Sequence, residues 1–235
     1  MDVGTVFAES WEAFRKQFRF LALFALSLFI LGSLLALLLT GSALLGLSGL
    51  SYADLAAGGG ANVLSASLSA AGLAGWGLSS LLLILLAPWL AGAGAAAGIL
   101  VTQKQKKVLR PWTPYAVAWA NYPALFALSI VLGITLWIGY WAFVLPGIIL
   151  STLLALSSYV VIGERVTMLE ALTTSWNLGI AHFSTILVTG LALVLIGWLI
   201  ALTAGLVPVV GQYLLVLVSV FASVTLAVVY KHATK

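Results

Sequence analysis

The amino-acid sequence predicts an all-α, polytopic membrane protein whose six transmembrane helices form three hairpins, each preceded by an amphipathic interfacial helix. Composition and the length of the apolar stretches lead to this prediction. Of 235 residues, 63% are hydrophobic and 7% are charged, and the mean hydropathy is +1.20. A soluble domain normally carries about 25% charged residues, so this chain has too few charges to cover a water-exposed surface. Six long apolar stretches follow one another, each near the roughly 20 residues that cross a bilayer.

The first hairpin begins with an amphipathic segment at residues 3–18. Its aromatic side chains recur at the spacing of one helical stripe, and its charged residues occupy the other faces. A helix of this kind is typical of the membrane interface. The stripe consists of Phe7, Trp11, Phe14 and Phe18, and the first span follows at about 20–44.

The first hairpin also contains a long connection. Residues 46–78 are rich in glycine, serine and alanine and carry one charge, Asp54, which predicts an extracytoplasmic loop. Residues 63–78 either form a separate interfacial helix or extend the second span, which covers about 79–101. We expect Pro88 to kink that span, as membrane helices tolerate.

The second span carries a face of small residues, Gly92, Gly94 and Gly98. Faces of this kind let two helix backbones approach closely. The sequence leaves two readings open: packing between helices of the same chain, or contact with another protomer or a partner protein.

The remaining spans follow with short connections. The fourth span should begin at a tight turn, Leu145-Pro146-Gly147, and Thr167 and Glu170 have the spacing of a capping box that starts another amphipathic helix. The third to sixth spans are expected at about 124–144, 147–163, 183–204 and from Pro208 to Tyr230.

Short aromatic motifs indicate a threefold repeat within a single membrane domain, 1–235. A tryptophan precedes three of the spans, and another aromatic residue stands seven positions after each tryptophan. Aromatic side chains anchor a helix at the headgroup level. The expected anchors are Trp11 with Phe18, Trp119 with Phe126, and Trp176 with Phe183, in units 3–110, 111–165 and 166–235.

The basic residues predict the orientation. With six spans, all ten lysines and arginines fall on one side of the membrane. The positive-inside rule places that side in the cytosol, so both termini should be cytosolic. We expect the densest basic group to contact anionic lipid head groups, each cation contributing about 1 kcal/mol; it comprises Lys104, Lys106, Lys107 and Arg110. Because topology accounts for the cations, the sequence predicts no nucleic-acid partner.

Residues that could perform chemistry are scarce. The chain has no cysteine, and its two histidines have no acidic neighbour at a metal-ligand spacing. No acidic, basic or histidine side chain falls well inside a predicted span, although proton relays and ion-coupled carriers depend on such groups. The sequence therefore predicts no catalytic, cofactor or metal site, and a protein that is not an enzyme.

Residues 144–187 resemble a known family. They contain a Pro-Gly-Ile-Ile turn at Pro146–Ile149, then the pair Glu164-Arg165, then an Ala-Leu-x-x-Ser-Trp-like helix at Ala171–Trp176. This order is similar to that of YciC-like bacterial inner-membrane proteins and of the membrane domain fused to some glycerophosphodiester phosphodiesterases. The resemblance implies a six-span fold in the bacterial cytoplasmic (inner) membrane. It implies no activity, because the phosphodiesterase domain is not part of this sequence.

Two kinds of function remain open. The first is a non-enzymatic integral membrane protein that acts as a scaffold, an accessory subunit or an envelope-homeostasis factor, alone as a homo-oligomer or within a larger membrane complex. The second is a permease or channel for a neutral or lipidic solute, which the proline kinks and the glycine-rich span would suit.

Overall fold

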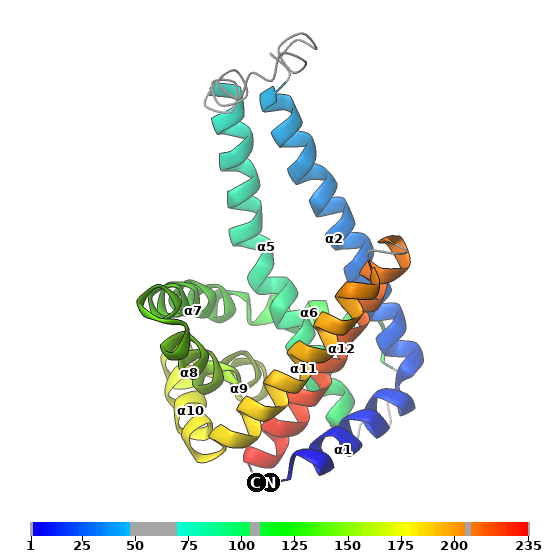
Figure 1. The fold of residues 1–235 in the computed structure, drawn as a ribbon, viewed down its shortest axis with the longest axis vertical. Helices are drawn as coiled ribbons and strands as arrows, with labels where there is room; N and C mark the ends of the chain where they lie inside the picture. Colours follow the sequence, from blue (N-terminus) through cyan, green and yellow to red (C-terminus); the bar gives the residue numbers. More distant parts are fainter. Residues whose placement is uncertain (1, 48–69, 104–108, 205–207, 235) are drawn as a thin grey trace. The chain divides into compact units, whose positions relative to one another are not determined.

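The computed structural model describes residues 2–47, 70–103, 109–204 and 208–234, and in these the chain forms helices and no strands (Figure 1). Six helical stretches are long and apolar enough to cross a membrane. They are Phe18–Leu35, Ser80–Thr102, Tyr122–Trp141, Val144–Glu164, Phe183–Leu202 and Val210–Ala233. The all-α fold with six potential spans, predicted from the sequence, is therefore confirmed.

The chain divides into two compact units. Unit 1 comprises Met1–Leu28 and Pro88–Lys235, and unit 2 comprises Phe29–Ala87. Unit 2 contains parts of α2 (Phe18–Leu47) and α5 (Ala70–Thr102), which have 30 and 33 residues. At 1.5 Å per residue these helices are about 45 and 50 Å long, more than the ~30 Å of a bilayer's hydrocarbon core.

The first connection is shorter than the predicted loop at 46–78. Helix α2 continues to Leu47, and α5 begins at Ala70 and runs without interruption into the second span. Residues 70–78 thus extend that span, and residues 48–69 lie outside the described part of the chain. Of the two alternatives for residues 63–78, the helix at 70–78 agrees with an extension of the second span, because alanine is the strongest helix former and outweighs the scattered glycines.

A short helix precedes the first, third and fifth potential spans. These are α1 (Val3–Lys16), α6 (Thr113–Ala120) and α10 (Met168–Ala181), and each is separated by one non-helical residue from α2, α7 (Tyr122–Ala142) or α11 (Phe183–Ala204). The separating residues have nearly the same backbone angles, with φ/ψ of −111°/22° at Gln17, −106°/13° at Asn121 and −122°/27° at His182.

The separating residues change the register of the expected repeat. The residue six positions before each of them is Trp11, Tyr115 and Trp176, so Tyr115, and not Trp119, occupies the position of the two tryptophans. Burial follows the same register. The residues seven positions before the break are Ser10, Pro114 and Ser175, those three positions before it are Phe14, Ala118 and Gly179, and all six are buried.

The fourth potential span consists of two helices, α8 (Val144–Leu154) and α9 (Ser157–Glu164). The expected turn at Leu145–Gly147 lies inside the first turns of α8, and the chain reverses at the extended residue Phe143 instead. Pro146 fits there because the first N–H groups of a helix have no intrahelical partner, so a missing N–H costs little.

Helix α10 packs against the interruption between α8 and α9. The hydroxyl of Ser175 donates to the carbonyl oxygen of Leu153 (3.0 Å), and that of Ser157 donates to the carbonyl oxygen of Leu154 (2.8 Å). A Cβ atom at Gly179 would lie 2.7 Å from Leu153 Cα, so glycine permits this approach. The hydroxyls thus satisfy carbonyls that the interruption frees, as an apolar environment requires.

The predicted capping box at the start of α10 is confirmed. The Thr167 hydroxyl accepts from the backbone N–H of Glu170 (3.5 Å), and the Glu170 carboxylate accepts from the backbone N–H of Thr167 (3.1 Å). This cap fixes the start of α10 at Met168, three residues after Arg165, whose φ of 55° turns the chain out of α9.

The glycine-rich end of α5 packs inside unit 1 against other helices of the same chain. A Cβ atom at Gly98 would meet the backbone carbonyl of Ser223 in α12 (Pro208–Ala233), and one at Gly94 would lie 3.1 Å from Ser223 Oγ. A Cβ atom at Gly92 would meet Leu125 of α7. These three glycines therefore serve helix packing within the chain. Around them the core is apolar, with Ala96, Ala97, Val160, Val224 and Val229 among its buried side chains.

Candidate functional site: a polar pocket at the charged end of unit 1

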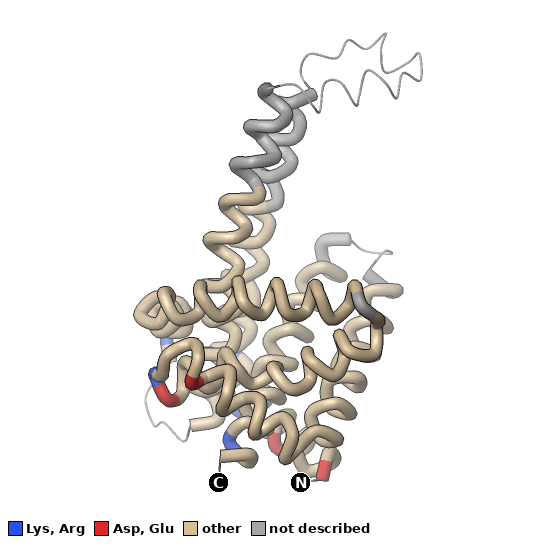
Figure 2. The backbone as a smooth tube through the Cα atoms, turned by 90° about the vertical axis from the view of Figure 1, so that its left-hand side faces the viewer, with Lys and Arg blue, Asp and Glu red and all other residues tan. Residues whose placement is uncertain are grey.

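The charged side chains of the described residues gather at one end of unit 1. In Figure 2 the acidic and basic segments lie in the part of the unit that holds both termini. They belong to α1, the start of α2, the residues before α6, the end of α9, the start of α10 and the end of α12. Arg110 is exposed, whereas Lys104, Lys106 and Lys107 lie outside the described residues, so their predicted contact with lipid head groups stays a prediction.

Helix α1 lies on α12 with a polar side and an aromatic side. Its buried residues, Val6, Ser10 and Phe14, recur every four positions and form the line of contact. Phe14 packs edge-on against Phe221 of α12, with ring centroids 5.4 Å apart. The amphipathic pattern thus divides along this line, and each side of α1 borders a different cavity.

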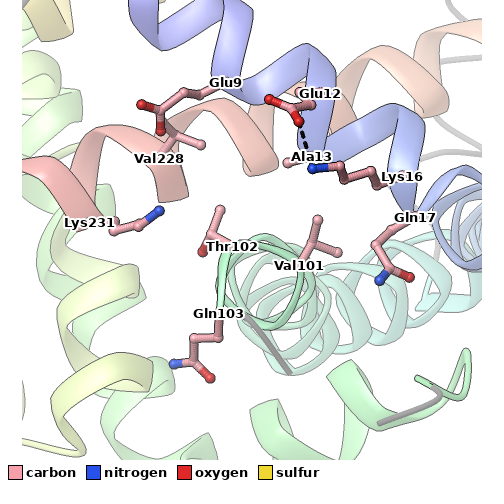
Figure 3. A pocket seen from close by; sticks show the side chains of 10 residues that line it. All are labelled: Glu9, Glu12, Ala13, Lys16, Gln17, Val101, Thr102, Gln103, Val228 and Lys231. Carbon is pink, nitrogen blue, oxygen red and sulfur yellow. Dashed lines mark hydrogen bonds and ion pairs between the residues drawn. The ribbon is translucent and has the colours of Figure 1, made fainter. Parts of the chain in front are cut away.

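The polar side of α1 borders a pocket of about 410 Å³ that also touches the ends of α5 and α12 (Figure 3). Its lining combines two carboxylates, two ammonium groups, two amides and a hydroxyl with a few small apolar side chains. The lining residues are Glu9, Glu12, Ala13, Lys16, Gln17, Val101, Thr102, Gln103, Val228 and Lys231.

An ion pair and a hydrogen bond organise the polar groups at the pocket. Lys16 Nζ lies 2.6 Å from Glu12 Oε1, and His232 Nε2 lies 3.0 Å from Glu9 Oε2. The hydrogen bond from Lys16 holds the pKa of the Glu12 carboxyl below its ordinary value. Lys231 has no ion-pair partner among the described residues, and in Figure 3 its amine points toward the space beside Thr102.

The aromatic side of α1 borders an apolar groove of about 460 Å³. Its other wall is formed by aliphatic side chains of α11 and α12, including Ile200, Leu214 and Leu217. Trp11 and Phe18, two of the predicted anchors, are 59% and 50% exposed. Phe14, which the sequence places on the same stripe, is instead buried against α12 because α1 rests on the boundary between its two sides.

The second predicted anchor pair, Trp119 and Phe126, belongs to a row of aromatic rings. Trp119 lies edge-on to Trp89 of α5 (6.1 Å) and stacks on Tyr122 (5.4 Å), which stacks on Phe126 (5.8 Å). Trp119 is 64% exposed. In the third pair, Trp176 remains 41% exposed and Phe183 is half-buried.

Tyr115 joins three helices at the inner end of the same aromatic row. Its hydroxyl lies 2.9 Å from the Ser27 hydroxyl of α2, and its carbonyl oxygen accepts from Trp89 Nε1 of α5 (3.0 Å). Burial raises the pKa of the Tyr115 hydroxyl. Tyr115 is not one of the predicted anchors, although the aromatic residue seven positions later, Tyr122, was a signal for it.

A second apolar cleft of about 450 Å³ lies between α7 and α8 on one side and α11 and α12 on the other. Its lining includes Tyr140, Ser151, Gly190 and Leu226. No group of three or more acidic, histidine or cysteine side chains suited to a metal ion occurs in the described residues.

The polar pocket was not predicted from the sequence, which indicated only that the charged residues of 3–18 occupy the faces away from the aromatic stripe. Only the packing of α1 on α12 brings residues 9–17 next to residues 228–232. A sequence signal did exist: α12 ends with Lys231 and His232 in its last turn, where cations complement the negative end of the helix dipole.

Comparison of the chain with protein-family models, with curated proteins and with solved structures finds no match. The structural features that bear on function are therefore the six potential membrane spans, the apolar core and the polar pocket at the charged end of unit 1.

Proposed function

We propose that this integral membrane protein is a non-enzymatic scaffold, accessory subunit or envelope-homeostasis factor of the bacterial cytoplasmic membrane. The observation that carries the proposal is the position of the charges. Among the described residues, acidic, basic and histidine side chains within the six potential spans occur only near their ends. Proton relays and many ion-coupled carriers use such groups at depth.

The buried polar groups support the same proposal. The hydroxyls of Ser10, Thr152 and Thr225 each donate to a carbonyl oxygen one turn earlier in the same helix. Each of these hydroxyls therefore uses its donor within its own helix. Thr189 Oγ1 is the buried side-chain polar atom in the described residues that lacks a partner, and a lone hydroxyl is insufficient for a transport site.

The proposal includes a membrane topology in which both termini lie in the cytosol. Its support is the gathering of the described charges at the end of unit 1 that holds the termini (Figure 2), combined with the positive-inside rule. The resemblance to YciC-like proteins supports the bacterial inner membrane as the location.

The chain offers a direct test of this orientation because it contains no cysteine. Single variants Thr234→Cys and Ser51→Cys would be treated with a membrane-impermeant maleimide in intact cells and after permeabilisation. We expect Ser51→Cys to react in intact cells and Thr234→Cys only after permeabilisation. The reverse pattern, or labelling of both from outside, would overturn the topology. The cysteine-free parent measures background labelling.

The scaffold role is tested by purification in a gentle detergent, with identification of the proteins that co-purify. We expect defined protein partners in a fixed ratio, or a homo-oligomer of fixed size. The same protein recovered as a monomer without partners, both from gentle detergent and after cross-linking in the membrane, would refute the role.

The apolar cleft between α7–α8 and α11–α12 favours one alternative, a permease for a lipidic solute. Gly190 lines this cleft, and a Cβ atom there would meet nothing within 4 Å. The variant Gly190→Phe should therefore fill the cleft without disturbing the backbone. A permease would lose transport of a short-chain fluorescent lipid in proteoliposomes, whereas Gly133→Phe, at an equally open position outside the cleft, would keep it. A scaffold would show no transport in any variant.

A further inference from the structure

We propose that the polar pocket beside α1 binds the head group of a zwitterionic phospholipid that carries a primary amine and a phosphate. The position of the pocket is the first support. It is lined by the last residues of α5 and by the end of α12, where two potential spans finish at Thr102 and Ala233. The ends of spans lie at the level of lipid head groups.

The charge of the lining is the second support. Among the described residues of the lining, Glu9 and Glu12 are negatively charged and Lys16 and Lys231 are positively charged, with Lys16 paired to Glu12. A purely anionic head group would face both carboxylates, and a simple cation would face both ammonium groups. A zwitterion can place its phosphate at Lys231 and its ammonium group toward the carboxylates, so each charge meets its opposite.

The end of α5 offers a second place for an ammonium group. The C-terminus of a helix carries a partial negative charge that a nearby cation stabilises, and α5 ends at Thr102 on the pocket. The Thr102 hydroxyl donates to the Ile99 carbonyl oxygen (3.0 Å), which leaves its lone pairs to accept from the ligand. A primary ammonium has three N–H donors for such acceptors, whereas a trimethylammonium group has none.

The remaining lining suits the start of a lipid tail. Ala13, Val101 and Val228 contribute apolar surface to the pocket. Its volume of about 410 Å³ falls within the range of roughly 300–1,000 Å³ that is typical of small-molecule sites. The same head-group chemistry is also available from free phosphoethanolamine, so the experiment has to separate the two sources.

The test is titration of the full-length protein in detergent, monitored by native mass spectrometry. The probes are phosphatidylethanolamine, phosphatidylcholine and phosphatidylglycerol with identical acyl chains. We expect phosphatidylethanolamine to bind about tenfold more tightly than the other two, the effect of one charge-assisted hydrogen bond. Equal affinity for all three lipids would overturn the proposal.

Substitutions of lining residues test whether phosphatidylethanolamine binds in this pocket. Lys231→Gln and Glu9→Gln should each remove about tenfold of the affinity for phosphatidylethanolamine, and Lys231→Arg should retain it. Arg19→Gln is the matched control, because it removes a cation of α2 that is outside the pocket. An unchanged affinity in Lys231→Gln, or an equal loss in Arg19→Gln, would refute the assignment. Size-exclusion profiles verify that each variant is folded.

Competition separates the two sources of the ligand. Displacement of the lipid by free phosphoethanolamine would assign recognition to the head group alone, and its absence would assign the site to the intact lipid. This inference is independent of the scaffold role: a protein without protein partners can still show the lipid preference, and a scaffold can lack it.

Discussion

Replacing Gly98 with alanine is expected to destabilise unit 1 by about 1–3 kcal/mol, the usual cost of extra volume in a packed core. The added Cβ would lie 2.9 Å from the carbonyl carbon of Ser223 and 3.0 Å from the Cβ of Ala227, and it would also meet the Ser223 carbonyl oxygen. Backbone atoms cannot rotate away, so α5 and α12 must separate. The same oxygen accepts a hydrogen bond from the Tyr159 hydroxyl (3.1 Å), which the separation would strain.

Two matched alanine variants isolate this effect. In Gly94→Ala the nearest atom to the new Cβ is Ser223 Oγ at 3.1 Å, a side-chain atom that can rotate, so we expect a loss well below that of Gly98→Ala. In Gly133→Ala nothing lies within 4 Å of the Cβ. That variant should be neutral or more stable by up to about 1 kcal/mol, because alanine favours the helix over glycine.

The measurement is the free energy of unfolding in mixed micelles, obtained by titration with a denaturing detergent. The expected order of stability is Gly133→Ala, wild type, Gly94→Ala and Gly98→Ala, from highest to lowest. If Gly98→Ala unfolds at the same detergent fraction as the wild type, then α5 and α12 do not approach as closely as described. If Gly133→Ala is destabilised equally, the cost arises from glycine replacement in general and the reasoning from Ser223 fails.

Four further variants probe other parts of unit 1. Gly179→Ala should lower the free energy of unfolding by about 1–3 kcal/mol because its Cβ would meet the α8 backbone. Ser175→Ala loses one hydrogen bond, worth about 0.6 kcal/mol in a membrane. Equal losses for the two variants in the same unfolding titration would contradict the close approach of α10 to α8. Thr167→Ala removes the cap of α10 and should cost about 1 kcal/mol, and an unchanged midpoint would show that the cap contributes nothing. The Lys16 bond that lowers the pKa of Glu12 favours the ionised carboxylate in the folded state. Its stabilisation should be present above the ordinary glutamate pKa and be lost as the pH falls through the lowered value. Melting temperatures of the wild type and Lys16→Ala should therefore converge at acid pH, and a constant difference would exclude the pair as the cause.

The aromatic residues show where sequence reasoning reached its limit. In the predicted repeat Trp11 and Trp119 are equivalent positions, because both are tryptophans that precede a span. The backbone breaks at Gln17 and Asn121 align Trp11 with Tyr115 instead. Helix breaks depend on local backbone angles that several polar residues can adopt, so the residues around Asn121 do not reveal the register by themselves.

The three glycines of α5 show the same limit in packing. Their spacing predicts a face that allows close approach, and this holds whether the approaching helix belongs to the same chain or to another. The structure places Gly94 and Gly98 against α12 and Gly92 against Leu125 of α7. The identity of the neighbour follows from the path of the whole chain, which no local pattern contains.

The sequence by itself determined the all-α class, the six potential spans and the cap of α10. These features depend on transfer of apolar side chains out of water and on hydrogen bonds between residues a few positions apart, and both are properties of contiguous segments. Tertiary structure alone decided that residues 9–17 and 228–232 share one pocket, and that the Leu153 carbonyl finds its donor in Ser175 of another helix. Contacts between residues distant in sequence exist only after the helices pack, because their geometry is set by the whole bundle.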